Sequence, residues 1–169
     1  MSYLGSKPMG RAPVAPINLE LVREKATDIR YALARLRQYG SVERNTFLED
    51  ETTVSAAKYQ FVVAIEAAQA LCNHLAARIA RQAPMSYGDC YTIIQRAGVI
   101  PPGLGERLVS MVKFRNLLVH KYGKVDDARV YEIMGSDLGD LEEYLDEVLE
   151  YLERRRDDET EKPTRDKAQ

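Results

Sequence analysis

Apolar residues recur every three or four positions along most of the chain, which is the period of one helix face. The first such pattern begins at Val22 and ends before Gly40, a residue that suits a helix end. The second runs from Val54 to Ile79 and stops before Pro84. Both patterns predict long amphipathic helices with one buried face.

The second half of the chain continues in the same way. Ser86 is positioned to cap a shorter helix that ends at Pro101. A long helix is predicted from about Pro102 to Tyr122, and a short one after Gly123, opened by acidic residues that suit a helix N-terminus. A last long pattern covers residues 138–152.

No alternating strand pattern and no internal repeat competes with this reading. Four long helices with short connections predict an all-α protein, an antiparallel up-down bundle of four long helices plus short helices. Apolar faces left over in such bundles often pair two chains about a two-fold axis, so we expect a homodimer.

The length of 169 residues suits one domain with a hydrophobic core. Residues 1–16 hold three prolines and two glycines without periodicity, which predicts a flexible tail. Residues 154–169 are dense in charge and lack large apolar side chains, which predicts a second, disordered tail. The bundle itself is assigned to residues 17–153.

Charge is distributed unevenly around a formal net charge of −2. Residues 105–124 hold five Lys/Arg and one acid, a balance of +4, whereas residues 126–153 hold eleven acids and one arginine, a balance of −10. A basic element beside an acidic one is compatible with a local anionic ligand.

The two cysteines, Cys72 and Cys90, form no metal-ligand pattern, and no apolar run has the length of a membrane span. We therefore expect a cytoplasmic protein that makes no membrane contact, with both thiols reduced and buried as small hydrophobic groups. We also expect no bound metal and no cofactor.

Residues 113–134 carry the chemistry that a structural helix does not need. An apolar stripe of the predicted helix from about Pro102 to Tyr122 includes Arg115 where a core residue belongs. Asn116 and His120 share a second face, and at about 100° per residue His120 points roughly 140° away from Arg115. The arginine side chain could bend round, the helix could loosen near Gly123, or a two-fold dimer could unite the groups. We favour the dimer.

Each of these residues also has an ordinary interpretation. Arg115 could extend to solvent or pair with a carboxylate, and His120 could be a hydrogen-bonded surface group. Glu66 lies on a mixed polar stripe, where it could either orient Arg115 or remain a solvated helix residue. Tyr122 could pack with its hydroxyl at the surface.

The segment "RNLLVHKY" resembles the R-x4-H-x-Y signature of HepT-like ribonuclease toxins of the HEPN superfamily. The likeness extends from about residue 19 to residue 152, through "QFVVAIEAAQALCNHLAARIARQAPMSYGDCYTIIQRAGVI" and "RLVSMVKFRNLLVHKYGKVDDARVYEIMGSDLGDLEEYLDEVLEYL". The resemblance implies a HEPN-like helical bundle, a homodimer, an RNA substrate and metal-independent endoribonuclease activity.

It also implies a partner, a minimal nucleotidyltransferase antitoxin that neutralises the toxin by attaching AMP to the tyrosine of the motif. By position, Arg115 and His120 would then be catalytic, Asn116 would support them, and Tyr122 would accept AMP. An imidazole suits proton transfer to and from RNA oxygens near neutral pH, and a guanidinium suits the phosphate.

Two other functions are compatible with the same sequence. The chain could be a non-catalytic module that docks a nucleotidyltransferase partner or a nucleotide, or a purely structural bundle dimer. Intact Arg115, Asn116, His120 and Tyr122 favour the ribonuclease, because a scaffold needs none of them.

Overall fold

The computed structural model describes residues 15–161, and within this range every regular element is a helix. This confirms the predicted all-α class. The predicted N-terminal tail lies outside the described residues except for its last two positions, and residues 162–169 also lie outside them.

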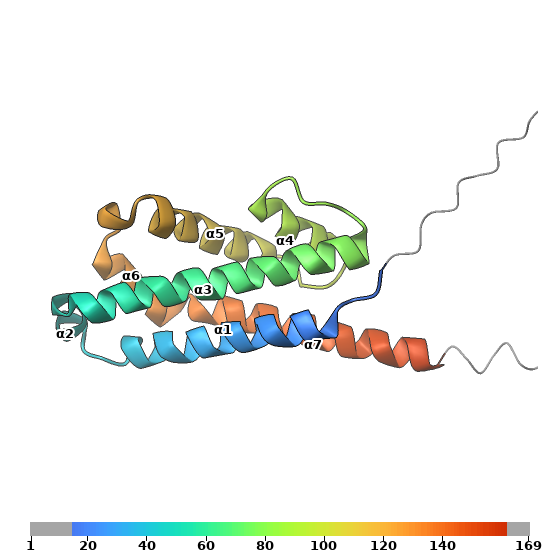
Figure 1. Ribbon diagram of the computed structural model, residues 1–169, viewed down its shortest axis with the longest axis horizontal. Helices are drawn as coiled ribbons and strands as arrows, with labels where there is room; N and C mark the ends of the chain where they lie inside the picture. Colours follow the sequence, from blue (N-terminus) through green and yellow to red (C-terminus); the bar gives the residue numbers. More distant parts are fainter. Residues whose placement is uncertain (1–14, 162–169) are drawn as a thin grey trace, which may run out of the picture.

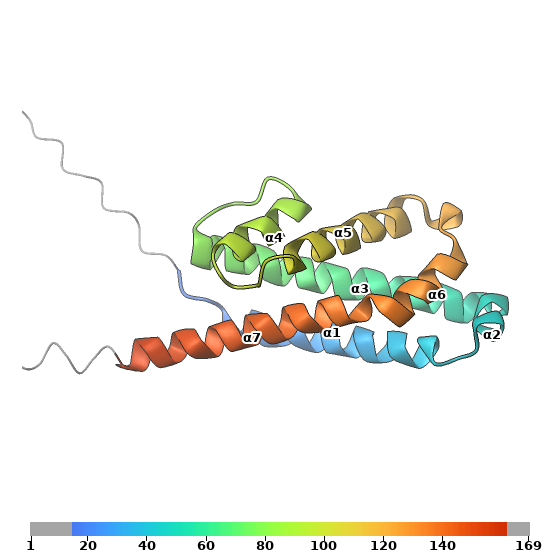
Figure 2. The same cartoon turned by 180° about the vertical axis from the view of Figure 1, so that it is seen from behind.

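Four long helices form the bundle: α1 (Leu19–Gly40), α3 (Glu51–Leu75), α5 (Leu104–His120) and α7 (Leu138–Glu161). They alternate in direction, so the predicted up-down topology is confirmed (Figure 1). Helix α3 lies between α1 on one side and α5 on the other, and α7 packs behind them (Figure 2). The chain enters and leaves the bundle at the same end.

Short elements close the connections between the long helices: α2 (Arg44–Glu49), a π-helical turn η1 (Ala76–Ala80), α4 (Tyr87–Arg96), a 3-10 turn η2 (Tyr122–Lys124) and α6 (Asp127–Ser136). Helix α2 was not predicted. Helix α4 ends at Arg96, earlier than expected, and Gly98 follows in the left-handed region with φ of 76°.

Side-chain caps explain where several helices begin. The Asn18 carboxamide accepts hydrogen bonds from the N–H groups of Glu20 and Leu21, and the Asp50 carboxylate accepts from Thr52 and Thr53. The predicted cap Ser86 accepts from the N–H of Asp89 over 3.1 Å. These caps satisfy backbone donors that a helix leaves unpaired in its first turn.

Aromatic pairs connect the helices in the core. Phe61 of α3 meets Phe114 of α5 edge to face, with centroids 5.2 Å apart. Tyr91 of α4 and Tyr144 of α7 form a second such pair at 5.7 Å, and the fully buried Tyr144 hydroxyl donates to the carbonyl of Ala68. Burial raises the pKa of both tyrosines.

Helix α4 is fixed against both of its neighbours. Gly105 at the start of α5 lies so close to α4 that its N–H donates to the Gln95 carboxamide over 3.1 Å, and a side chain here would collide with that group. On the other side, Cys90 of α4 is joined to Cys72 of α3 by a disulfide, with Cα atoms 6.0 Å apart. The expectation of two reduced thiols is therefore wrong in this structure. Both sulfurs are buried as predicted, but the packing of α4 on α3 brings them together.

The C-terminal boundary also differs from the expectation. Helix α7 continues to Glu161, so the first eight residues of the predicted tail are helical. Ion pairs spaced four residues apart, Glu150 with Arg154 and Arg155 with Glu159, support this last part of the helix. Among the helices of residues 15–161, none has the length and apolar character to cross a membrane.

Candidate functional site

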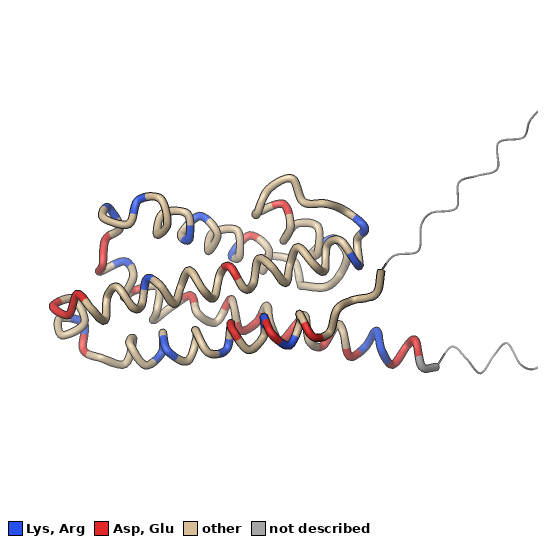
Figure 3. The backbone as a smooth tube through the Cα atoms, in the orientation of Figure 1, with Lys and Arg blue, Asp and Glu red and all other residues tan. Residues whose placement is uncertain are grey.

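The predicted site residues lie along the line where α3 and α5 run antiparallel. Lys58 against Tyr122 and Glu66 against Arg115 show the register: an advance along α3 matches a retreat along α5 and the turn that follows it. Lysine and arginine recur along α5 and the segment after it (Figure 3). Polar groups therefore gather along one side of an otherwise apolar contact.

Arg115 is anchored rather than free. Its side chain is 18% exposed, it forms an ion pair with Glu66, and it donates to Asn116 Oδ1 over 3.2 Å. Its guanidinium carbon lies 6.0 Å from the centroid of the Tyr87 ring. Of the two interpretations for Glu66, the structure shows the contact with Arg115. These partners hold a permanently charged fork at the edge of the α3–α5 contact.

His120 is the last residue of α5, and its side chain is exposed. In the described part of the chain it makes no hydrogen bond or ion pair, with Arg115 or with any other group. A single copy of the chain thus brings Arg115, Asn116 and Glu66 together and leaves His120 apart from them.

Tyr122 does not continue the helical stripe, because α5 ends at His120 and Tyr122 opens the 3-10 turn η2. Its ring packs against a buried cation: Lys58 Nζ lies 4.6 Å from the ring centroid. The lysine side chain is only 7% exposed and pairs with Asp127 over 2.6 Å. Tyr122 itself remains 47% exposed, so its ring is held while one side is open to solvent.

Lys58 was not singled out from the sequence, although a lysine among the buried positions of α3 is itself a signal. A buried ammonium needs a partner to offset its lost hydration. Asp127 of α6 supplies the negative charge, and the Tyr122 ring packs against the ammonium group of Lys58.

Three lysines near the end of α5 add positive charge. Lys113, Lys121 and Lys124 are exposed, and within residues 15–161 they form no ion pair. They line a cleft of about 560 Å³ on the side of α5 that faces α6 and α7, together with the exposed Leu117. The site thus has cationic groups on both sides of α5.

The other histidine has a structural role. The backbone N–H of Asn18 donates to His74 Nε2 over 2.9 Å, which ties the start of α1 to α3. Desolvation, followed by the charge of Arg78, lowers the pKa of His74. In the described segment, no group of three His, Cys, Asp or Glu side chains is arranged to hold a metal ion.

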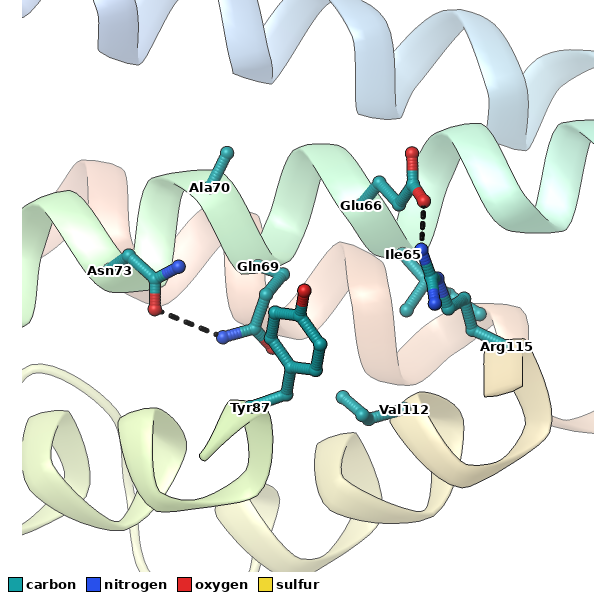
Figure 4. Close-up of a pocket in the computed structure, with 8 residues that line it drawn as sticks. All are labelled: Ile65, Glu66, Gln69, Ala70, Asn73, Tyr87, Val112 and Arg115. Atoms are coloured by element: carbon teal, nitrogen blue, oxygen red, sulfur yellow. Dashed lines mark hydrogen bonds and ion pairs between the residues drawn. The ribbon is translucent and has the colours of Figure 1, made fainter. Parts of the chain in front are cut away.

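A cavity of about 230 Å³ lies beside Arg115, lined by residues of α3, α4 and α5 (Figure 4). Gln69, Asn73 and Tyr87 line it together with the Glu66–Arg115 pair. Gln69 and Asn73 lie on the same mixed polar stripe of α3 as Glu66, but they were not predicted as site residues. Tyr87 has no periodic signal and enters the site only because α4 folds back onto α3 and α5.

Solved structures share this fold. A tri-AMPylated HEPN toxin from Shewanella oneidensis, in complex with an MNT antitoxin, superposes with a TM-score of 0.71 at 23% identity, covering 76% of this chain and 96% of that one. A cytosolic protein of unknown function from Bacillus subtilis, YutE, has a TM-score of 0.71 at 18% identity, covering 82% and 93%. At these identities the likeness concerns the fold.

Sequence comparison identifies the family, which the shared fold alone does not. An mRNA nuclease, HepT of Shewanella oneidensis, is 25% identical over 130 residues, which cover 76% of this chain and 96% of that protein. Residues 29–148 match the family described as ribonuclease HepT-like, and this segment holds α3, α5 and every predicted site residue. The resemblance seen in the sequence is thereby confirmed, and the chain belongs to the HepT-like ribonuclease family.

Proposed function

We propose that this chain is the toxin of a toxin–antitoxin pair and acts as an endoribonuclease in the cytoplasm. The observation that carries the proposal is Arg115, a guanidinium fixed by Glu66 and Asn116 at a cavity edge, five residues before an exposed histidine. The related nuclease HepT and the toxin–antitoxin complexes of the same fold support this assignment.

Cleavage uses the nucleophile that RNA carries. A base takes the proton of a 2′-hydroxyl, the 2′-oxygen bonds to phosphorus, and the bond from phosphorus to the 5′-oxygen breaks as an acid protonates that oxygen. The products are a 2′,3′-cyclic phosphate and a 5′-hydroxyl. His120 is the group for proton transfer, and the Arg115 fork binds the phosphate as its negative charge grows. This route needs no metal ion.

A homodimer would bring the two groups to one phosphate. Within one chain the exposed His120 has no contact with Arg115, and its neighbours Leu117 and Val119 expose apolar surface, 47% and 44%. A second copy seated on this surface would cover the apolar groups and place its own histidine near the first chain's arginine. Two histidines could then divide the acid and base roles.

Inhibition by a minimal nucleotidyltransferase antitoxin would act at Tyr122. The tyrosine lies two residues after His120, beside Lys121 and Lys124, with its ring held by Lys58. An AMP group attached to its hydroxyl adds bulk and negative charge next to the phosphate-binding side chains. Both effects repel RNA.

Activity is tested with the chain purified without its antitoxin and shown by intact mass to be unmodified. It is incubated with total RNA in excess chelator beside His120→Ala, Arg115→Ala and the control His74→Gln, which removes the other histidine but keeps an acceptor. We expect cleavage by wild type and control, and losses of about 10²–10⁴-fold in the two site variants. Chelator-sensitive cleavage would contradict the metal-free route. Absence of cleavage by the unmodified wild-type dimer would favour a docking module.

Mixing the two inactive variants tests the shared site. In a heterodimer of Arg115→Ala with His120→Ala, a site built from Arg115 of one chain and His120 of the other is intact once per dimer. We therefore expect activity to return on mixing. Continued inactivity of a verified heterodimer would place both groups in one chain, or require all four.

A further inference from the structure

The cavity beside Arg115 has walls that neither phosphate binding nor proton transfer requires. The apolar side chains of Ile65, Ala70 and Val112 line it, and the Tyr87 ring stands at its open side (Figure 4). Its volume of about 230 Å³ lies below the roughly 300–1,000 Å³ of pockets for drug-sized ligands. It suits one flat nucleobase.

Gln69 leaves a polar atom without a partner inside this cavity. The residue is 6% exposed, and its Nε2 donates to Asn73 Oδ1 over 3.2 Å. Its Oε1 is fully buried and has no hydrogen-bond partner among the described residues. Buried side-chain oxygens nearly always accept a hydrogen bond. An unpaired buried oxygen on a residue that lines a cavity therefore indicates that a hydrogen-bond donor is missing.

The neighbouring Asn73 offers the complementary group. Its carbonyl is used by Gln69, and the exposed position of the side chain leaves its NH₂ able to donate. One buried acceptor and one exposed donor therefore lie on successive turns of α3, at the two ends of the hydrogen bond between Gln69 and Asn73. Adenine presents the complementary groups, an amino donor and ring-nitrogen acceptors.

Tyr87 and Arg115 extend the match to a nucleotide. Tyr87 is 53% exposed and supplies a ring face on which a base can stack, the usual mode for unpaired RNA bases. Glu66, which holds Arg115, and Asn73 are seven residues apart, about 10 Å along the helix. A phosphate bound at Arg115 and a base edge bound at the far end of the cavity would be separated by about this distance.

We propose that this cavity is a nucleobase subsite that binds an unpaired adenine next to the phosphate held by Arg115. The inference rests on the proposed function and deepens it, because it assigns a base preference to the cleavage site. Gln69 accepts from the adenine amino group, Asn73 donates to a ring nitrogen, and Tyr87 stacks on the ring. The disulfide between Cys72 and Cys90 holds the α4 segment that carries Tyr87.

The test measures binding independently of cleavage. Labelled 2′-O-methyl strands, abasic except for one central A, C, G or U, are titrated with the unmodified protein and followed by fluorescence anisotropy. We expect the adenine strand to bind about tenfold more tightly than the C and U strands, in line with one bidentate contact. Equal affinity for all four strands, or no binding at all, would overturn the proposal.

Gln69→Leu removes the amide while nearly keeping its size, and it should fold at least as well, because an unpaired buried polar group disappears. We expect it to abolish the adenine preference. Gln60→Leu is the matched control: it makes the same change on α3, at another unpaired Oε1 that does not line the cavity, and should keep the preference. A preference that survives Gln69→Leu would refute the subsite.

The same strands with one cleavable ribonucleotide separate this inference from the proposed function. Cleavage without base preference would refute the subsite and leave the ribonuclease standing. Adenine preference without cleavage would refute the ribonuclease and leave a base-binding site. A shift of the dimer equilibrium by Gln69→Leu, measured by sedimentation without any change in base preference, would show that a second copy covers the cavity and would overturn the proposal.

Discussion

The ammonium group of Lys58 lies 4.6 Å from the centre of the Tyr122 ring, and the same nitrogen is paired with Asp127. Three elements, α3, η2 and α6, therefore meet at one buried charge. The contact fixes the tyrosine ring without covering all of it. Such an arrangement keeps the tyrosine in one position and leaves it accessible to a modifying enzyme.

Lys58→Met keeps the length of the side chain and removes its charge. We expect unfolding free energy to fall by about 1–2 kcal/mol, because the ring contact is lost and Asp127 loses its partner. Transfer of AMP to Tyr122 by the cognate nucleotidyltransferase should slow several-fold, measured by intact mass over time. Lys113→Met, at an exposed lysine of α5, is the control and should change neither quantity. An unchanged transfer rate in Lys58→Met would show that the contact is structural only.

Glu66→Gln tests whether Arg115 needs its carboxylate. Glu66 is 52% exposed, so its pair with Arg115 should contribute little to stability, and the thermal midpoint should hardly move. RNA cleavage should nevertheless fall about tenfold, because a misdirected guanidinium binds the phosphate poorly. Glu150→Gln, which breaks the exposed pair with Arg154, is the control and should cleave like wild type. Full activity in Glu66→Gln would assign the positioning of Arg115 to Asn116 alone.

The pKa of His74 is lowered by burial, so the folded state favours the neutral ring that accepts from Asn18. The stability linked to this histidine is therefore fully present above its ordinary pKa of 6.5 and is lost as the pH falls through the lower folded value. Thermal midpoints measured from pH 8 to pH 5 should decline less steeply in His74→Gln than in wild type. Identical slopes in His74→Gln and wild type would contradict the assignment.

The disulfide closes a segment of the chain between positions 18 residues apart. A loop of this size constrains the unfolded chain by about 3 kcal/mol. Reduction should lower the thermal midpoint of wild type and leave that of Cys90→Ala unchanged. Intact mass under non-reducing conditions checks the bond directly, and two free thiols in air-oxidised protein would contradict it.

The long helices were predictable because each buries a continuous stripe. Val22, Ile29 and Leu36 of α1 follow the period of 3.6, and all are buried. Helix α2 has only six residues and one buried side chain, Phe47, so it offers no period to detect. The last turns of α7 were not predicted because they carry no apolar period. Ion pairs support the helix there instead.

The site was predictable only within α5. Arg115, Asn116, His120 and Tyr122 follow one another in the sequence, and their motif could be compared with a family. Their roles stay predictions. Contacts between helices depend on register, which periodicity does not contain. The pairing of Lys58 with Asp127, the approach of Tyr87 and the joining of Cys72 to Cys90 all depend on how α3, α4 and α6 are placed.

The antiparallel register of α3 and α5 limits how the length of this protein can change during evolution. Lys58 and Glu66 are eight residues apart on α3, and their partners Tyr122 and Arg115 are seven apart on the returning chain. Inserting or deleting one residue between Lys58 and Glu66 would rotate one contact by about 100° away from its partner. The exposed segment 81–86 carries no such constraint. Relatives should therefore vary in length in that loop and keep the spacing within α3.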